Sequence, residues 1–260
     1  MTISRLHIPV LALALTLAAC ADFKGFQRRQ PPPISEEAQA QINLGAALLM
    51  QGEYVKALPE LLRARELAPK NADLENYLGL AYYYGQREYE LAIESYQKAL
   101  ALNPGRTDVR NNLGLVYLEM EEYDQALNEF NICLQDLVYQ NKHLPLTNIG
   151  LTWMRKKDYD QALDYLNRAV EIAPGYANAY KEIGKVHIAR GNYDFALDYL
   201  VNAARLNDSD PDAFMELGDL YGRLGKPDEA AQAYSQAAFL APNTPLALEA
   251  QRRARQIMGF

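Results

Sequence analysis

The fold is decided by a stretch of 34 residues that recurs along the chain, of which His143 to Tyr176 is one copy: HLPLTNIGLTWMRKKDYDQALDYLNRAVEIAPGY. Here the Ile-Gly pair at 149–150 is followed by Ala162 and Ala169, and Pro174 lies near the end. Small residues let two helices approach closely, and proline ends a helix because it lacks an N–H and clashes with the preceding turn. The stretch therefore predicts two antiparallel helices that pack through glycine and alanine.

Six copies of this pattern lie in register. The Leu-Gly or Ile-Gly glycines are separated by 34, 35, 36, 34 and 34 residues and are Gly45, Gly79, Gly114, Gly150, Gly184 and Gly218. A fixed period of this length is typical of arrays in which each unit packs on its neighbours. We expect six units at 38–71, 72–106, 107–142, 143–176, 177–210 and 211–244. Residues 245–260, with three arginines, are expected to form a helix that caps the last unit.

This pattern resembles the tetratricopeptide repeat (TPR), which implies an all-α fold, a right-handed superhelix (α-solenoid) with a concave groove. In that family the groove-facing positions lie three before, and one, four and five after, each glycine. Carried onto this chain, they give the partner-binding candidates Ile42, Leu49, Met50, Asn76, Tyr83, Tyr84, Asn111, Leu115, Met154, Lys181 and Lys185. An exposed strip of Met and Tyr favours binding of a protein. The alternative for any one of them is packing against a neighbouring unit.

Two of these candidates are basic. Lys181 and Lys185 lie one helical turn apart and could meet a carboxylate of a partner, or they could belong to a solvated helix face. The Asn/Lys pattern of carboxylate clamps that bind chaperones is not repeated in adjacent units.

Composition argues against several other functions. The formal charge is −7 and the chain has no basic block, so nucleic acid is not an expected ligand. Two cysteines and three histidines do not make a zinc site or a disulfide framework. Cys133 replaces an alanine of the repeat and should be buried and inert. We expect a binding protein without metal or cofactor, not an enzyme.

The first 19 residues read as a targeting segment. Ile8–Ala19 is an apolar run that is too short to span a bilayer and fits the core of a secretory signal peptide. The ending Leu17-Ala18-Ala19-Cys20 resembles a bacterial lipobox, which implies cleavage before Cys20 and a covalent lipid on it. Ala21, where an Asp would favour inner-membrane retention, implies an outer-membrane lipoprotein facing the periplasm. A plain signal peptide with an incidental cysteine is the alternative.

Residues 20–37 are expected to be a tether, because Pro31-Pro32-Pro33 favours an extended chain. The proline run could instead bind a partner.

Two irregular units suggest a narrower resemblance. The second unit has one extra residue near Tyr84–Glu88, and the third has two and lacks its proline near Gln135–Lys142. This is similar to the type IV pilus pilotin lipoproteins (PilF/PilW type). That resemblance implies binding of a secretin subunit and its delivery to the outer membrane. The alternatives are a TPR lipoprotein that scaffolds another envelope complex, such as secretion machinery, or a subunit for assembly of cell-wall enzymes.

Overall fold

The computed structural model describes residues 34–259, in which every regular element is a helix. One pair of helices corresponds to each of the six expected units, and one more helix follows. The first helix begins at Glu36, because Ser35 caps it, so the last two residues of the expected tether 20–37 are helical. The bounds are α1 (Glu36–Met50) and α2 (Tyr54–Leu67); α3 (Ala72–Ala81), continued by the π-helix η1 (Tyr82–Gln86), and α4 (Tyr89–Leu102); α5 (Thr107–Glu119) and α6 (Tyr123–Gln135); α7 (His143–Arg155) and α8 (Tyr159–Ile172); α9 (Ala177–Ala189) and α10 (Tyr193–Leu206); α11 (Pro211–Arg223) and α12 (Pro227–Leu240); and α13 (Pro245–Ile257). The α-solenoid expected from the sequence is confirmed.

The glycine of each first helix makes room for a large side chain of the second helix. A Cβ on Gly79 would lie 2.4 Å from Cε1 of Tyr96, and one on Gly150 would lie 2.6 Å from Cγ of Leu166 and 3.1 Å from the backbone oxygen of Ala162. The prediction that glycine meets alanine was therefore incomplete, because the large residue fills the space above the glycine. The residues in this position are Leu61, Tyr96, Phe130, Leu166, Leu200 and Tyr234.

The turn inside each pair needs one residue with a left-handed backbone. Gly52, Gly191 and Gly225 supply it with φ of 75°, 76° and 69°, and glycine adopts this conformation without a steric penalty. In the two middle units, Glu121 and Lys157 take the same role at φ of 62° and 63°. These two turns keep the same geometry at a cost of about 1 kcal/mol each.

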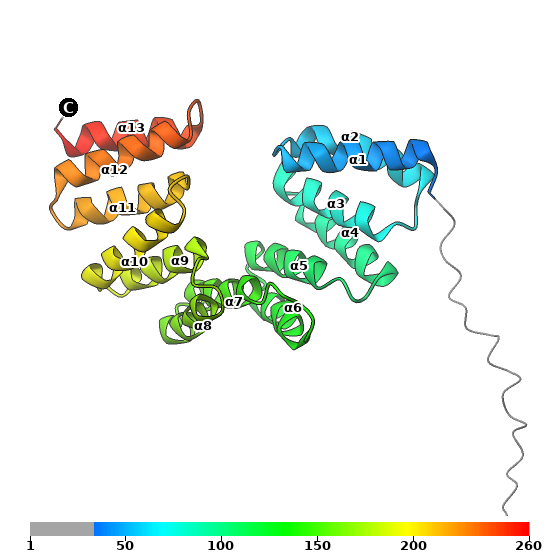
Figure 1. The fold of residues 1–260 in the computed structure, drawn as a ribbon, viewed down its shortest axis with the longest axis horizontal. Coiled ribbons are helices and arrows are strands. Elements are labelled where there is room, and N and C mark those ends of the chain that lie inside the picture. Colours follow the sequence, from blue (N-terminus) through cyan, green and yellow to red (C-terminus); the bar gives the residue numbers. More distant parts are fainter. Residues whose placement is uncertain (1–33, 260) are drawn as a thin grey trace, which may run out of the picture. The chain divides into compact units, whose positions relative to one another are not determined.

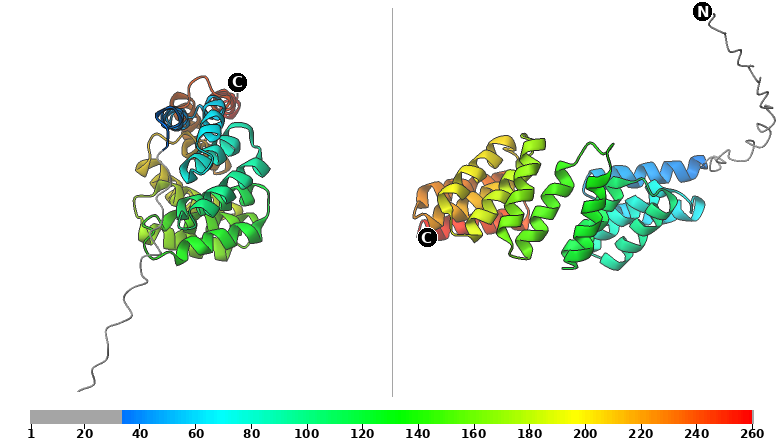
Figure 2. Two further views of the ribbon diagram at one scale, coloured as in Figure 1. Left: turned by 90° about the vertical axis from the view of Figure 1, so that its right-hand side faces the viewer. Right: turned by 90° about the horizontal axis from the view of Figure 1, so that it is seen from below.

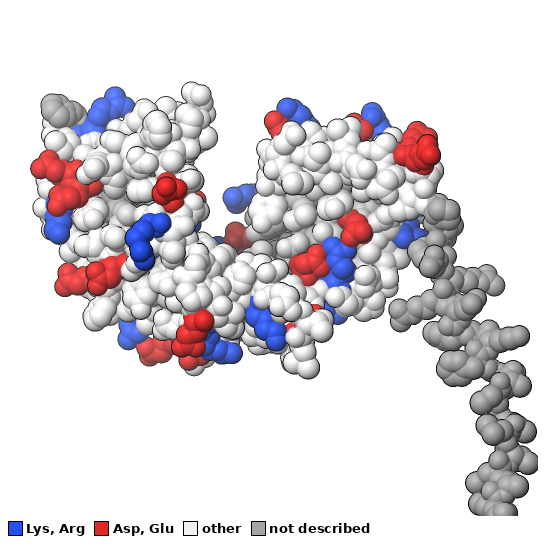
Figure 3. Space-filling model, in the orientation of Figure 1, with Lys and Arg blue, Asp and Glu red and all other residues white. Residues whose placement is uncertain are grey.

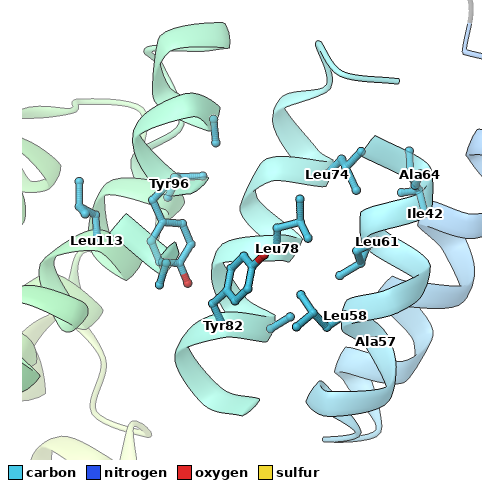
Figure 4. Packing of buried hydrophobic residues seen from close by; sticks show 14 of the residues in the cluster. Ile42, Ala57, Leu58, Leu61, Ala64, Leu74, Leu78, Tyr82, Tyr96 and Leu113 are labelled. Carbon is cyan, nitrogen blue, oxygen red and sulfur yellow. The ribbon is translucent and has the colours of Figure 1, made fainter. Parts of the chain in front are cut away.

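Successive units share one continuous core. In Figure 4, Leu74 and Leu78 of α3 lie next to α2, and Tyr96 of α4 lies toward Leu113 of α5. Leu74, Leu78 and Tyr96 have no exposed surface. Each unit thus buries its apolar faces only with the help of its neighbours, as expected of a solenoid.

The pairs follow one another around an arc (Figure 1), and Figure 2 shows them stacked side by side. Helices α5, α7 and α9 lie on the inner side of the arc, whereas α6, α8 and α10 lie on the outer side. First helices also contact each other, because α5 contacts α7, α7 contacts α9 and α9 contacts α11. The inner surface is therefore built from first helices.

Helix α13 covers the open side of α12, as the cap was expected to do. Arg253 of α13 donates to both oxygens of Asp219 on α11, at 2.5 and 2.6 Å. Tyr234 of α12 donates to the same carboxylate at 2.6 Å. One carboxylate thereby ties the last three helices together.

Candidate protein-interaction surface

The predicted groove residues all lie on the first helices or on η1, but three of them need correction. Ile42, Asn76 and Asn111 have only 4, 5 and 6% of their surface exposed. Ile42 belongs to the core. The prediction counted positions from the repeat glycine and took no account of how closely the next helix packs. In this structure the next helix packs closely enough to bury these three side chains.

The two buried asparagines link neighbouring units. The side-chain amide of Asn112 donates to Oδ1 of Asn76 at 3.4 Å, and that of Asn148 donates to Oδ1 of Asn111 at 2.9 Å. The asparagines therefore set the spacing of α3, α5 and α7 rather than offering groups to a ligand.

The extra residue of the second unit changes the end of a helix. It is accommodated in η1, one turn of π-helix that continues α3, and Arg87 follows with φ of 55°. The Glu88 N–H donates to the Tyr82 carbonyl at 3.1 Å and closes the turn. The wide turn places Tyr83 and Tyr84 next to each other on the surface. Single π-turns inside helices are frequent at functional sites.

These residues line a shallow pocket of about 250 Å³ at the end of the second unit. Its residues are Tyr83, Tyr84, Arg87, Tyr89 and Glu119. The rings of Tyr83 and Tyr84 meet edge to face at 4.5 Å, and Tyr54 of α2 stacks on Tyr84 at 5.1 Å. Such aromatic pairs stabilise one another by about 1 kcal/mol. The pocket is therefore a supported group of rings rather than separate surface tyrosines.

The pocket offers both apolar and polar contacts. Half of the Tyr84 surface is exposed, whereas Tyr83 is half-buried. Burial raises the pKa of both hydroxyls, which therefore stay protonated at neutral pH and can donate hydrogen bonds. Glu119 at the end of α5 pairs with Arg155 of α7, in the next helix pair, at 2.7 Å.

The other apolar candidates differ in how much surface they offer. Met50, at the end of α1, is 90% exposed, and Leu49 beside it is half-buried against the core. Leu115 and Met154 are half-buried on α5 and α7. Among the predicted apolar residues, Met50 and Tyr84 thus offer the most accessible surface.

The two lysine candidates are already matched by carboxylates of this chain. Lys181 pairs with Asp210 at 2.8 Å, with only 13 and 17% of the two side chains exposed. Lys185 pairs with Glu182 at 3.0 Å. A carboxylate of a partner would therefore have to compete with a partly buried internal pair.

Sequence reasoning identified Tyr83 and Tyr84 but not the pocket they belong to. Tyr54, Tyr89 and Arg87 were not among the predicted binding residues. The one available signal was the extra residue of the second unit, which lies among these positions.

Other predicted residues have simpler positions. Cys133 is fully buried, as expected, and its thiol donates to the Thr107 carbonyl at 3.4 Å. Burial raises its pKa to about 12, so little thiolate forms at neutral pH. The ring of His187 stacks on the rings of Phe195 and Tyr199, with ring centroids 5.5 Å apart in both pairs. Cys20 and the targeting segment lie outside the described residues.

Across residues 34–259, His, Cys, Asp and Glu side chains nowhere gather in a group that could hold a metal ion. None of the helices in that range combines the length and apolar character that crossing a membrane requires.

Helix pairs repeated in register and stacked through shared cores define the class of helical-repeat scaffolds. Within this class, family models described as tetratricopeptide or TPR repeat match residues 16–72 and 181–255 with one model, and 83–121 and 143–209 with two others. The chain belongs to the tetratricopeptide repeat family, whose members are scaffolds for protein interactions.

Solved structures agree with the fold. A structure titled as the functional characterization of Pseudomonas aeruginosa pilF is 25% identical, with a TM-score of 0.62, covering 84% of this chain and 97% of that one. PilW, titled a type IV pilus biogenesis factor, is 19% identical, with a TM-score of 0.68 over 83% and 98%. A TPR protein from Parabacteroides merdae is 18% identical, with a TM-score of 0.72 over 84% of both chains.

No protein of curated function matches the sequence. The structures titled Cut9-Hcn1 and yeast Tom70 superpose with the same TM-score of 0.68 as PilW, so these likenesses establish the fold.

Proposed function

We propose that this chain is a membrane-anchored TPR scaffold of the type IV pilus pilotin kind, which binds a secretin subunit and aids its localisation and assembly in the outer membrane. The single observation that carries the proposal is the similarity to pilF, which spans nearly the whole of both chains at 25% identity. The lipobox-like ending at Cys20 and the irregular second and third units support it.

The proposed mechanism is physical and involves no catalysis. A lipid on Cys20 would hold the chain at the periplasmic face of the outer membrane, since two or more acyl chains give stable anchoring. The secretin subunit would bind at the inner surface. The pocket around Tyr84 would supply the strongest contacts, because clustered aromatic side chains dominate the binding energy of protein interfaces.

A TPR lipoprotein that scaffolds another envelope complex, for cell-wall synthesis or secretion, remains the second candidate. It rests on the tetratricopeptide repeats themselves, which the family models match without specifying a partner. Both candidates share the anchor and the protein-binding surface, and they differ in the partner.

The partner is tested by deleting the gene in its host and assaying secretin multimers in outer-membrane fractions on an unheated gel. Loss of multimers, restored by the parent gene, supports the pilotin role. Unchanged multimers and normal pili would exclude it and favour the second candidate.

The anchor is tested separately with Cys20→Ala. We expect this variant to lose acylation and to leave the membrane fraction, while circular dichroism of the helical array stays unchanged. Membrane association that persists at the parent level would contradict the lipid anchor.

A further inference from the structure

The pocket at the end of the second unit contains a basic side chain that has no partner among the described residues. Arg87 lines this pocket and is exposed. None of the ion pairs formed within residues 34–259 involves its guanidinium. A guanidinium binds a carboxylate through two parallel N–H donors, so this one can bind an acidic group of another molecule.

The backbone at Arg87 shows that the turn itself does not require arginine. Gly52 and Gly191 hold the same position in other units, two residues before the first residue of the second helix. Arg87 adopts the same left-handed backbone, with φ of 55°, two residues before Tyr89. Glycine adopts this conformation without the steric penalty that a side chain adds. A glycine at residue 87 would therefore keep the turn, and the arginine side chain can be tested apart from the fold.

The acidic residue of the pocket is already compensated. Glu119 pairs with Arg155 of α7 at 2.7 Å. Of the two charged residues that line the pocket, Arg87 is thus the one left to attract a charged group of a ligand. Figure 3 shows acidic and basic side chains interspersed over the face in view, with no broad basic area among the described residues. The local charge therefore suits a single carboxylate rather than a polyanion.

The tyrosines provide the apolar part of the pocket. The ring centroid of Tyr83 lies 4.5 Å from that of Tyr84 and 6.1 Å from that of Tyr89. The pocket volume of about 250 Å³ is below the roughly 300–1,000 Å³ of sites that enclose a whole small molecule. The pocket therefore suits one large apolar side chain of a protein segment, packed on the rings.

We propose that this pocket recognises an extended segment of a partner protein in which a large apolar side chain lies two residues from an Asp or Glu. Side chains two residues apart in an extended chain lie on the same face, so both meet the same surface. The apolar side chain packs on Tyr83 and Tyr84, and the carboxylate accepts hydrogen bonds from Arg87. This inference rests on the proposed function, because the segment belongs to the protein that the scaffold binds.

The test measures binding of short peptides to the purified full chain by isothermal titration calorimetry at low salt. The probe is Asp-Ala-Phe-Ala-Asp with both ends blocked, and the comparison peptides replace both Asp by Asn or by Lys. We expect the Asp peptide to bind about fivefold more tightly than the Asn peptide, and the difference to narrow at high salt. Replacing the peptide's Phe by Ala should weaken binding by about tenfold.

Two variants with the same change of charge separate the pocket from the rest of the surface. Arg87→Gly should bind the Asp and Asn peptides equally, at the affinity that the parent has for the Asn peptide. Binding of the Asn peptide at the parent level shows at the same time that this variant is folded. Lys157→Gly, at the same turn position in the fourth unit and outside this pocket, is the matched control and should keep the preference for Asp.

Equal affinities of the parent for the Asp and Asn peptides, or a preference that persists in Arg87→Gly, would overturn the proposal. Tighter binding of the Lys peptide would overturn it in favour of a cationic segment that binds at Glu119. The absence of binding by every peptide would overturn it as well. The peptides contain no secretin sequence, so loss of secretin multimers in the deletion strain without a preference for Asp would leave the pilotin role in place and exclude only this inference.

Discussion

The first two units and the last two share one packing scheme but present different surfaces. In units one and two, tyrosines gather around a π-turn, and Tyr84 and Met50 are open to solvent. In unit five Lys181 and Lys185, and in the cap that follows unit six Arg253, are each matched by a carboxylate of the same chain. A paired charge has little left to gain from a partner, whereas an exposed ring gains by burial. Under the proposed function, we expect the tyrosine pocket at the N-terminal end to contribute most of the binding energy.

The largest expected effects test the shared packing. Gly79→Ala and Gly218→Ala should each lower the free energy of unfolding by about 2 kcal/mol, because the new methyl group would meet Tyr96 at 2.4 Å or Tyr234 at 2.5 Å. Gly175→Ala, in a loop with no atom within 4 Å of the new methyl group, is the control and should change stability little. Urea denaturation measures all three. A much smaller loss at one end would show that the two ends are packed differently.

A matched pair of tyrosines should respond with opposite signs. Tyr234→Phe removes the hydrogen bond to Asp219 and should lose about 1.5 kcal/mol. Tyr96 is fully buried and its hydroxyl has no partner, so Tyr96→Phe should gain about 1 kcal/mol. Thermal unfolding of the two variants tests both predictions. A loss of stability for Tyr96→Phe would mean that the Tyr96 hydroxyl has a hydrogen-bond partner.

A smaller effect depends on pH. Glu75 is 3% exposed, and burial raises its pKa above 4.5, although Arg65 and Lys98 oppose the shift. The folded state then binds the proton more tightly than the unfolded state, so stability contributed by this group is present below pH 4.5 and lost as pH rises through the folded-state pKa. Glu75→Gln should therefore be the more stable protein at pH 7 and equal to the parent at pH 4. Equal stability at both values would contradict the raised pKa.

The smallest effect concerns the turns of the middle units. Lys157→Gly should gain about 0.5 kcal/mol, because glycine relieves the left-handed backbone at φ of 63° but also loosens the unfolded chain. Gly191→Ala, at the same place in the fifth unit, should lose stability instead. A melting temperature that falls for Lys157→Gly would show that the lysine side chain stabilises its turn.

Much of the architecture was predictable because the repeat spacing determines which residues share a face. Gly150, Ala162 and Pro174 sufficed to predict a helix, a second helix and the end of the pair. Short-range spacing does not reveal the partner of Lys181, which is 29 residues away at Asp210.

The candidate site was less predictable for the same reason. The sequence showed one extra residue near Tyr84, but packing decides whether a loop or a helix accommodates it. Gly85 lies against Tyr54, since a Cβ there would be 3.2 Å from Cβ of that tyrosine. This close contact comes from α2, and it places the ring of Tyr54 on Tyr84.

The most direct test of the N-terminal binding site compares two changes to exposed aromatic residues. A strain lacking the gene is complemented with the parent, with Tyr83→Ala plus Tyr84→Ala, or with Phe239→Ala, whose ring is 76% exposed on α12. Secretin multimers in the outer membrane are then measured at equal levels of the three proteins. The account predicts full restoration by the parent and by Phe239→Ala, and at least a tenfold loss for the double tyrosine variant. Full restoration by the double tyrosine variant would contradict it.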